Sequence, residues 1–217
     1  MKRQEAMECF KAFPIYGITA ESMSEGRNSV EVVEAMLQAG IRFVQYREKD
    51  KSGLARYEQC LAIRELTRKY GAALIIDDFV DLAIAVDADG VHIGQEDLPV
   101  QVVRRLLGPD KLIGLSTHEP AQLAKANELA EQLDYVGVGP VYATQTKKTA
   151  LPVGLEYVTY AAQHSRLPFV AIGGIKEHNI QAVAQAGATQ VAVVSDITSA
   201  PDIQGKIKRL AQLMQEG

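Results

Sequence analysis

The residues best able to do chemistry stand directly after short apolar runs, and QYREK is the first such place. Gln45, Arg47 and Lys49 alternate there, so on an extended strand they share one face, and two residues rise roughly 6.6 Å. This spacing predicts an amide deep in a strand-lined site and two cations nearer its rim. Arg47 and Lys49 also suit the solvated end of a strand, but inward polar groups are costly unless they are used.

Three carboxylates follow two later apolar runs. Asp77 and Asp78 end ALIIDD, and Asp97 follows GVHIG in the segment GQED. Neighbouring strands lie roughly 4.8 Å apart, so Asp78 and Asp97 could meet over one ion. Mg²⁺ suits such a pair because it takes one or two carboxylates, several waters and substrate phosphate oxygens. The alternative for either aspartate is a helix N-cap, a role that Asp97 before Leu98-Pro99 fits well.

Hydroxyls and ammonium groups gather in GPVYATQTKKTALPVG, residues 139–154. Thr144, Thr146, Lys147 and Lys148 offer hydrogen-bond donors and positive charge to a polyanion. A solvated basic loop is the alternative. The expected placement of the loop opposite two of the aspartate positions favours a binding role.

Ser116 and His118 follow the apolar run KLIGL. Ser116 is a candidate polar group for the site, although serine is also a good N-cap for the helical pattern PAQLAKA. His118 could act as an acid or a base, but no partner for it is visible in the sequence.

Short β-branched runs alternate eight times with amphipathic helical patterns, which predicts parallel strands joined by right-handed crossovers. Eight such units in about 200 residues are the count and size of a TIM barrel. An open doubly wound sheet is the alternative, but no G-x-G-x-x-G follows the first strand. We expect one (β/α)8 TIM barrel over residues 13–217 and an N-terminal extension over residues 1–12, and loss of residues 1–10 should change little. The predicted strands are 14–19, 42–48, 73–78, 90–94, 111–117, 134–141, 168–174 and 190–196.

Active sites of such barrels lie at the carboxyl ends of the strands, where these polar residues fall. Gly174 follows the seventh run, and Val194 and Ser195 end the eighth. Loops after the last two strands often bind phosphate, and glycines let backbone N–H groups approach an anion. The pattern predicts one phosphate subsite and one Mg²⁺–pyrophosphate subsite, which indicates a transferase with two phosphorylated substrates.

Composition limits the kinds of partner. The formal net charge is −4, and no cluster of Lys and Arg suggests a nucleic acid or membrane surface. The sequence has neither a signal peptide pattern nor 18 consecutive apolar residues, so we expect a cytoplasmic protein acting on small molecules. The oligomeric state stays open, a homo-oligomer included.

The segments from about residue 14 to 202 resemble thiamine phosphate synthases, in order and with similar spacing. The resemblance is carried by QYREK, IIDDFVDLA, ADGVHIGQEDLP, IGLSTH, YVGVGPVYATQTKK, VGLE, VAIGGI and VAVVS. It implies joining of 4-amino-5-hydroxymethyl-2-methylpyrimidine pyrophosphate to 4-methyl-5-(2-hydroxyethyl)thiazole phosphate. The products are thiamine phosphate and pyrophosphate, and the implied mechanism is dissociative and assisted by Mg²⁺.

The resemblance also implies roles for individual residues. Asp78 and Asp97 are expected to hold Mg²⁺, and Gln45, Ser116 and Lys147 to act at the reacting centre. Residues around the pyrophosphate and pyrimidine are expected to be Arg47, Lys49, Asp77, Thr144, Thr146 and Lys147, together with Gln45 and Ser116. Gly174, Val194 and Ser195 are expected to bind the thiazole phosphate.

Five positions depart from the family pattern: Ala20, Asp77, Phe79, Ala143 and Asp196. Asp77 stands where Asn is common, and Asp196 would weaken phosphate binding if it faced the phosphate. One alternative is a thiazole tautomerase that uses His118 as acid–base. Another is a non-catalytic regulatory barrel that binds thiazole phosphate.

Overall fold

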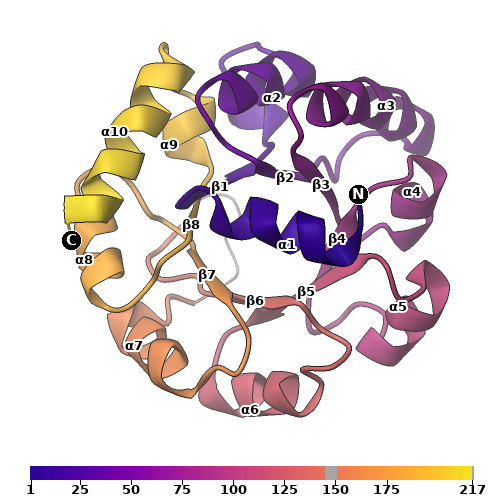
Figure 1. Cartoon of the computed structure of the whole chain (residues 1–217). Helices are drawn as coiled ribbons and strands as arrows, with labels where there is room; N and C mark the ends of the chain where they lie inside the picture. Colours follow the sequence, from indigo (N-terminus) through magenta and orange to yellow (C-terminus); the bar gives the residue numbers. More distant parts are fainter. Residues whose placement is uncertain (145–150, 217) are drawn as a thin grey trace.

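The computed structural model describes residues 1–144 and 151–216 and contains a closed barrel of eight parallel strands in chain order (Figure 1). This confirms the predicted (β/α)8 TIM barrel. Every strand is fully buried or nearly so, as expected for a parallel sheet covered on both faces. The strands are β1 (Ile15–Ile18), β2 (Phe43–Tyr46), β3 (Ala73–Asp77), β4 (Gly90–Ile93), β5 (Leu112–Thr117), β6 (Tyr135–Val138), β7 (Phe169–Ile172) and β8 (Val191–Val193).

Helices surround the barrel as an outer ring (Figure 1). They are α2 (Ser29–Gln38), α3 (Gly53–Lys69), α4 (Val80–Ala85), α5 (Val100–Leu107), α6 (Pro120–Glu128), α7 (Gly154–His164), α8 (Ile180–Gln185) and α10 (Ile203–Glu216). Two further short helices, η1 (Glu21–Met23) and α9 (Ser195–Thr198), follow β1 and β8. The strand predicted to run to residue 196 therefore ends three residues earlier. No helix in the described part of the chain is both long and apolar enough to cross a membrane.

Local sequence signals explain where the helices begin and end, and α2 illustrates this. The Asn28 side chain accepts hydrogen bonds from the N–H groups of Val30 and Glu31, and Glu31 accepts from the Asn28 N–H in return. This capping box satisfies donors that a helix start leaves unpaired. The helix ends before Gly40, whose φ of +112° is readily adopted only by glycine.

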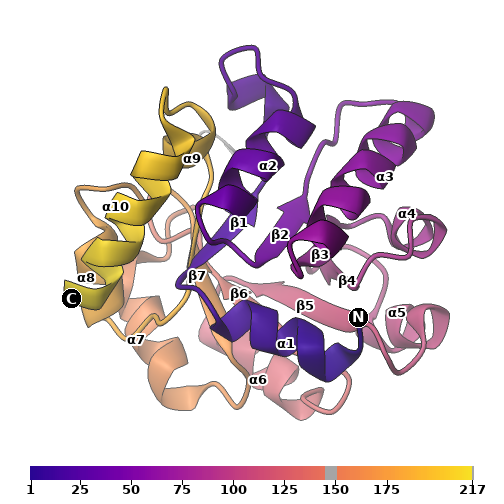
Figure 2. The ribbon, with the colours of Figure 1, turned by 45° about the horizontal axis from the view of Figure 1, so that its top comes forward.

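A helix that the sequence analysis did not predict, α1 (Arg3–Lys11), lies across one end of the barrel (Figures 1 and 2). Its Phe10 ring centroid lies 5.2 Å from that of Phe43 and 5.0 Å from that of Tyr135. Ala6 and Phe10 are both buried in the cluster that fills the barrel interior. The chain before residue 13 thus closes the amino-terminal end of the barrel, and the opposite end is left for the site.

Candidate active site

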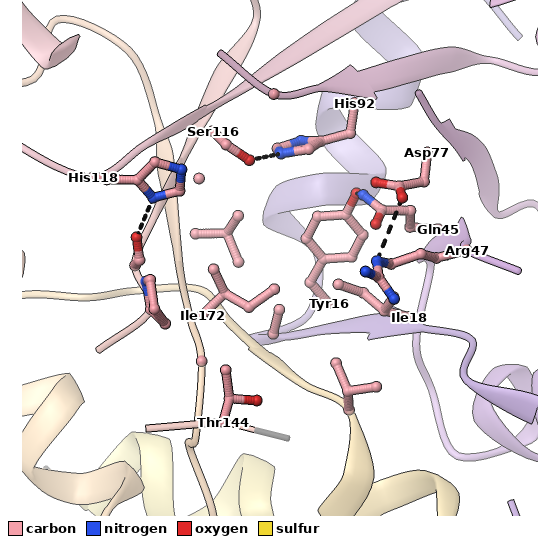
Figure 3. Close-up of a pocket in the computed structure, with 18 of the residues that line it drawn as sticks. Tyr16, Ile18, Gln45, Arg47, Asp77, His92, Ser116, His118, Thr144 and Ile172 are labelled. Carbon is pink, nitrogen blue, oxygen red and sulfur yellow. Dashed lines mark hydrogen bonds and ion pairs between the residues drawn. The ribbon is translucent and has the colours of Figure 1, made fainter. Parts of the chain in front are cut away.

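A cavity of about 840 Å³ opens at the carboxyl ends of the strands (Figure 3). Residues on or directly after all eight strands line it. The structure brings together here eleven of the predicted site residues: Gln45, Arg47, Lys49, Asp77, Asp78, Asp97, Ser116, Thr144, Gly174, Val194 and Ser195. The other two, Thr146 and Lys147, lie outside the described residues.

Two cations and two carboxylates form one charged cluster at the ends of β2 and β3. The Lys49 ammonium lies 2.6 Å from Asp78 Oδ2 and 3.6 Å from Asp77 Oδ2, and Arg47 Nε lies 3.4 Å from the same Asp77 oxygen. Burial lowers the pKa of Lys49, but the hydrogen bond to Asp78 and the charge of Asp77 outweigh it and raise that pKa. Gln45 lies on β2, which ends at Tyr46, so Arg47 and Lys49 follow the strand rather than continuing its face as predicted, and all three line the cavity.

Asp77 is the most deeply buried member of this cluster, at 7% exposure. Burial, together with the charge of Asp78, raises the pKa of Asp77 to about 7, against the lowering effect of Arg47 and Lys49. Its Oδ2 atom is buried and has no hydrogen-bond partner among residues 1–144 and 151–216. It is instead compensated by the charges of Arg47 and Lys49, at 3.4 and 3.6 Å, so it depends on these two cations.

The two carboxylates expected to hold Mg²⁺ both reach the cavity. Asp78 follows β3 with φ of +61°, an uncommon conformation outside glycine that often marks functional positions. Asp97 Oδ2 accepts from the Gly94 N–H at 2.6 Å, and the N-cap residue of α5 is Pro99. Asp97 is therefore not the helix cap that its sequence context allowed.

The donor set fits Mg²⁺. Within the described part of the chain, no three His, Cys, Asp or Glu side chains gather to hold a metal. Asp78 and Asp97 are two hard carboxylates that line the cavity, beside the Lys49 cation that already pairs with Asp78. Mg²⁺ is commonly bound in this way, with water and substrate phosphate oxygens completing its shell.

Ser116 lies on β5, and its hydroxyl is 2.9 Å from His92 Nε2. The N-cap residue of α6 is Glu119, so Ser116 is not the cap of that helix.

Tyr16, His92 and Gln95 also line the cavity and were missed in the sequence analysis. Tyr16 and His92 are polar side chains within buried strands, which is the same signal that singled out Gln45.

His118 lines the cavity, and its Nδ1 lies within hydrogen-bonding distance of the Gly139 carbonyl oxygen (Figure 3). Because a carbonyl only accepts, Nδ1 must carry the proton. In the neutral imidazole the opposite nitrogen, Nε2, is then an acceptor. His118 can therefore accept a hydrogen bond from a ligand at the cavity wall.

The glycines after β7 are required by close backbone packing. A Cβ on Gly173 would lie 2.4 Å from Pro140 Cα, and one on Gly174 would lie 2.5 Å from the Ala143 carbonyl oxygen. Both residues also have positive φ values, of 103° and 62°. The turn thus presents bare backbone to the cavity, as an anion-binding turn requires.

Two of the departures from the family pattern are explained by their surroundings. Asp196 Oδ2 accepts from the Glu177 N–H at 3.2 Å and lies 3.6 Å from the Lys206 ammonium, so the carboxylate is engaged outside the cavity. The Phe79 ring, where a basic residue is common, lies beneath the Arg56 guanidinium at 3.9 Å. Ala20 is buried, and nothing in the structure explains its choice.

A closed eight-stranded barrel with a charged cavity at the carboxyl ends of its strands defines a (β/α)8-barrel enzyme. The thiamine monophosphate synthase family model matches residues 15–197, and the chain belongs to that family.

Individual relatives agree with this assignment. The chain is 51% identical to a thiamine-phosphate synthase of Caldicellulosiruptor saccharolyticus over 217 residues, which is 100% of this chain and 97% of the relative. It is 50% identical to one of Pelotomaculum thermopropionicum over 215 residues, covering 99% and 98%. A solved structure of thiamine phosphate pyrophosphorylase from Pyrococcus furiosus superposes with a TM-score of 0.84 at 33% identity, covering 95% and 98%.

Proposed function

We propose that the chain joins 4-amino-5-hydroxymethyl-2-methylpyrimidine pyrophosphate to 4-methyl-5-(2-hydroxyethyl)thiazole phosphate, giving thiamine phosphate and pyrophosphate. The observation that carries this proposal is the charged cluster of Arg47, Lys49, Asp77 and Asp78 in the same cavity as the bare Gly173–Gly174 turn. One region suits a metal-bound pyrophosphate, and the other suits a phosphate monoester. A cavity of about 840 Å³ is large enough for two small substrates.

The pyrophosphate end is held by cations. Asp78 and Asp97 would hold Mg²⁺, which when bound supplies positive charge to the oxygens of the pyrophosphate. Arg47 and Lys49 add fixed positive charge beside it, with Thr144 as a hydroxyl donor and Thr146 and Lys147 as further donors from the same loop. Negative charge grows on pyrophosphate as it leaves, so these donors stabilise the transition state more than the bound substrate.

The pyrimidine lies deeper, between Gln45, Ser116 and Asp77. The amide and the hydroxyl can orient ring nitrogens, and the exocyclic amino group of the pyrimidine is a donor for the Asp77 carboxylate, which lines the cavity. Breaking the methylene–oxygen bond leaves both electrons on pyrophosphate and a cation on the pyrimidine methylene carbon. The thiazole nitrogen then supplies the electron pair for the new carbon–nitrogen bond.

The thiazole phosphate is held at the opposite wall. Gly174 and the chain at Val194 and Ser195 are proposed to donate to its oxygens, with Ser195 starting the short helix α9. Anchoring the phosphate there fixes the direction from which the thiazole nitrogen approaches. Such orientation can supply a large share of rate acceleration for a two-substrate reaction.

The test is a reaction with both substrates and Mg²⁺, in which thiamine phosphate is oxidised and detected as fluorescent thiochrome. We expect product with both substrates, none when either is omitted, and none after chelation of Mg²⁺ by EDTA. Tautomerisation of a thiazole carboxylate phosphate without thiamine phosphate formation would instead support the tautomerase alternative, in which His118 is the acid–base group. Binding of thiazole phosphate without any turnover would support a regulatory barrel.

A further inference from the structure

A continuous chain of hydrogen bonds crosses the barrel interior between two residues of the cavity wall, Gln45 and Ser116. Gln45 Nε2 donates to the Tyr16 hydroxyl at 2.8 Å, and the Tyr16 and Tyr135 hydroxyl oxygens are 2.9 Å apart. The Tyr135 oxygen is 3.1 Å from His92 Nδ1. His92 Nε2 completes the chain at 2.9 Å from Ser116 Oγ. The five residues come from β2, β1, β6, β4 and β5, so the chain links strands far apart in sequence.

The three middle members are shielded from water. Tyr16 is 2% exposed, Tyr135 is fully buried and His92 is 9% exposed, and the tyrosine rings pack against Phe10 and Phe43. Bulk water therefore does not compete for these hydrogen bonds, and each group depends on its neighbours in the chain. Figure 3 shows Tyr16, Gln45, His92 and Ser116 grouped on one side of the cavity.

The amide end favours one direction for these hydrogen bonds. An amide nitrogen only donates, so the Tyr16 oxygen accepts from Gln45 and its hydroxyl hydrogen is available to Tyr135. Tyr135 must then donate its own hydrogen to His92 Nδ1. A neutral His92 with an accepting Nδ1 carries its proton on Nε2 and donates it to Ser116 Oγ. The Ser116 hydroxyl hydrogen is consequently left to point at a ligand.

Burial favours the neutral forms of Tyr16, Tyr135 and His92, which this direction requires. Burial raises the pKa of both Tyr16 and Tyr135. Burial also lowers the pKa of His92 to about 4, with the opposing charge of Asp97 and the reinforcing charge of His118 as smaller effects.

We propose that Tyr16, Tyr135 and His92 are positioning residues that make the Ser116 hydroxyl an obligatory hydrogen-bond donor to the bound pyrimidine substrate. Their proposed role is to act through Ser116, to which His92 is joined directly and the two tyrosines through His92. The inference rests on the proposed function for the identity of the substrate, but the direction of the hydrogen bonds can be tested without any substrate.

The first test is the tautomer of His92 in the ligand-free full chain at neutral pH. Long-range ¹H–¹⁵N NMR correlations distinguish a protonated ring nitrogen from an unprotonated one. The protein has four histidines, so few signals have to be separated. His92→Gln identifies the His92 signals by their loss. We expect a neutral ring protonated on Nε2. A ring protonated on Nδ1, or a charged ring, would overturn the proposed direction.

The second test asks whether the hydrogen-bond chain of Tyr16, Tyr135 and His92 affects substrate binding through Ser116. Affinity for the pyrimidine pyrophosphate with Mg²⁺ is measured by calorimetry for the wild type, Tyr135→Phe, Ser116→Ala and the double variant. Loss of one hydrogen bond in the chain is expected to weaken binding roughly 5- to 10-fold in the wild-type background. In the Ser116→Ala background the same change is expected to weaken binding less than about 2-fold.

Equal weakening in both backgrounds would show a merely structural role and would overturn the proposal. Tyr46→Phe is the matched control, because it removes a buried strand hydroxyl that bonds Gln59 outside the cavity. The affinity of Tyr46→Phe for the pyrimidine pyrophosphate should equal that of the wild type.

If Tyr135→Phe does not fold, Tyr16→Phe interrupts the same hydrogen-bond chain one link further from Ser116. If the wild type binds no pyrimidine pyrophosphate, the proposed function and the Ser116–substrate contact both fail, whereas the His92 tautomer still decides the direction of the chain.

Discussion

The Lys49 ammonium lies 2.6 Å from Asp78 Oδ2, so the carboxylate proposed to hold Mg²⁺ is paired with a cation proposed to hold pyrophosphate. Asp78 would hold Mg²⁺ when the metal is bound, and Lys49 would then be available to the oxygens of the leaving pyrophosphate. The ion pair thus keeps both charges compensated until the substrate enters, since an uncompensated charge in a partly buried site is costly.

Asp78→Asn should lose about 10²–10³ in turnover, because it removes charge on which stabilisation of the leaving pyrophosphate depends. Thermal unfolding should stay close to that of the wild type, since Asp78 lies at the cavity rather than in the core. Steady-state thiochrome formation at several Mg²⁺ concentrations measures the loss. Asp81→Asn, an exposed change on α4, is the control and should retain wild-type turnover. An Asp78→Asn variant as active as this control would show that Asp78 does not hold the metal.

Asp77→Asn should change the pH dependence of stability. The pKa of Asp77 is raised to about 7 in the folded chain, above the ordinary value of 3.8, so the folded state binds the extra proton between these pH values. Stability from this group is therefore present at low pH and is lost as the pH rises from about 4 through about 7. The amide does not titrate, so the variant should lack this decline.

The measurement for Asp77 is urea unfolding of both metal-free proteins at pH 5 and pH 8. We expect the free energy of unfolding of the wild type to fall relative to that of the variant between these two pH values. A constant difference would mean that Asp77 stays ionised throughout, and that Arg47 and Lys49 compensate its burial fully.

Gly174→Ala should weaken binding of the thiazole phosphate. The added Cβ would lie 2.5 Å from the Ala143 carbonyl oxygen and 2.7 Å from Tyr142 Cβ, so the turn must move. We expect the KM for thiazole phosphate to rise roughly 10-fold, corresponding to about one lost hydrogen bond to a charged group. The KM for the pyrimidine substrate should change much less.

Gly71→Ala is a closely matched control for this change. Gly71 has φ of +61°, close to the +62° of Gly174, but a Cβ there meets nothing within 4 Å. Both variants therefore carry the same backbone strain, and only Gly174→Ala adds the clash beside the cavity. Equal effects of the two changes on the KM would show that the turn makes no specific contribution to binding.

Phe10→Ala should destabilise the chain by about 3–5 kcal/mol, the usual cost of removing a large buried aromatic side chain. Phe10 closes the barrel interior against Phe43 and Tyr135, so loss of residues 1–10 should be at least as damaging. This reverses the expectation from sequence that such a truncation changes little. Urea unfolding tests the prediction, with Glu8→Ala on the exposed face of α1 as the control. Phe10→Ala as stable as Glu8→Ala would restore the original expectation.

The alternation of strands and helices was readable from sequence because each barrel strand is an apolar run and each outer helix has one apolar face. The same regularity predicted Gln45, Arg47 and Lys49 on one strand face; all three line the cavity, but β2 ends at Tyr46, so Arg47 and Lys49 reach it from the segment after the strand. Helix α1 was missed because only Ala6 and Phe10 of its nine residues are buried, so its apolar face is too narrow to stand out.

The interior hydrogen-bond chain could not be predicted, because it depends on where distant strands meet. Tyr16 and Tyr135 are 119 residues apart, and their contact exists only once the barrel has closed. The helix-cap alternatives for Asp97 and Ser116 were equally open, since capping and site roles use the same residue types. Only the position of Asp97 relative to Gly94, and of Ser116 relative to His92, distinguishes the two roles.

The most direct test of the account follows both products of one reaction, thiamine phosphate as thiochrome and pyrophosphate by ³¹P NMR. The chain is supplied with both substrates and Mg²⁺. We expect the two products in a one-to-one ratio and the loss of both on adding EDTA. Release of pyrophosphate without thiamine phosphate would show a hydrolase, and an absence of both products from the folded chain would contradict the proposed reaction.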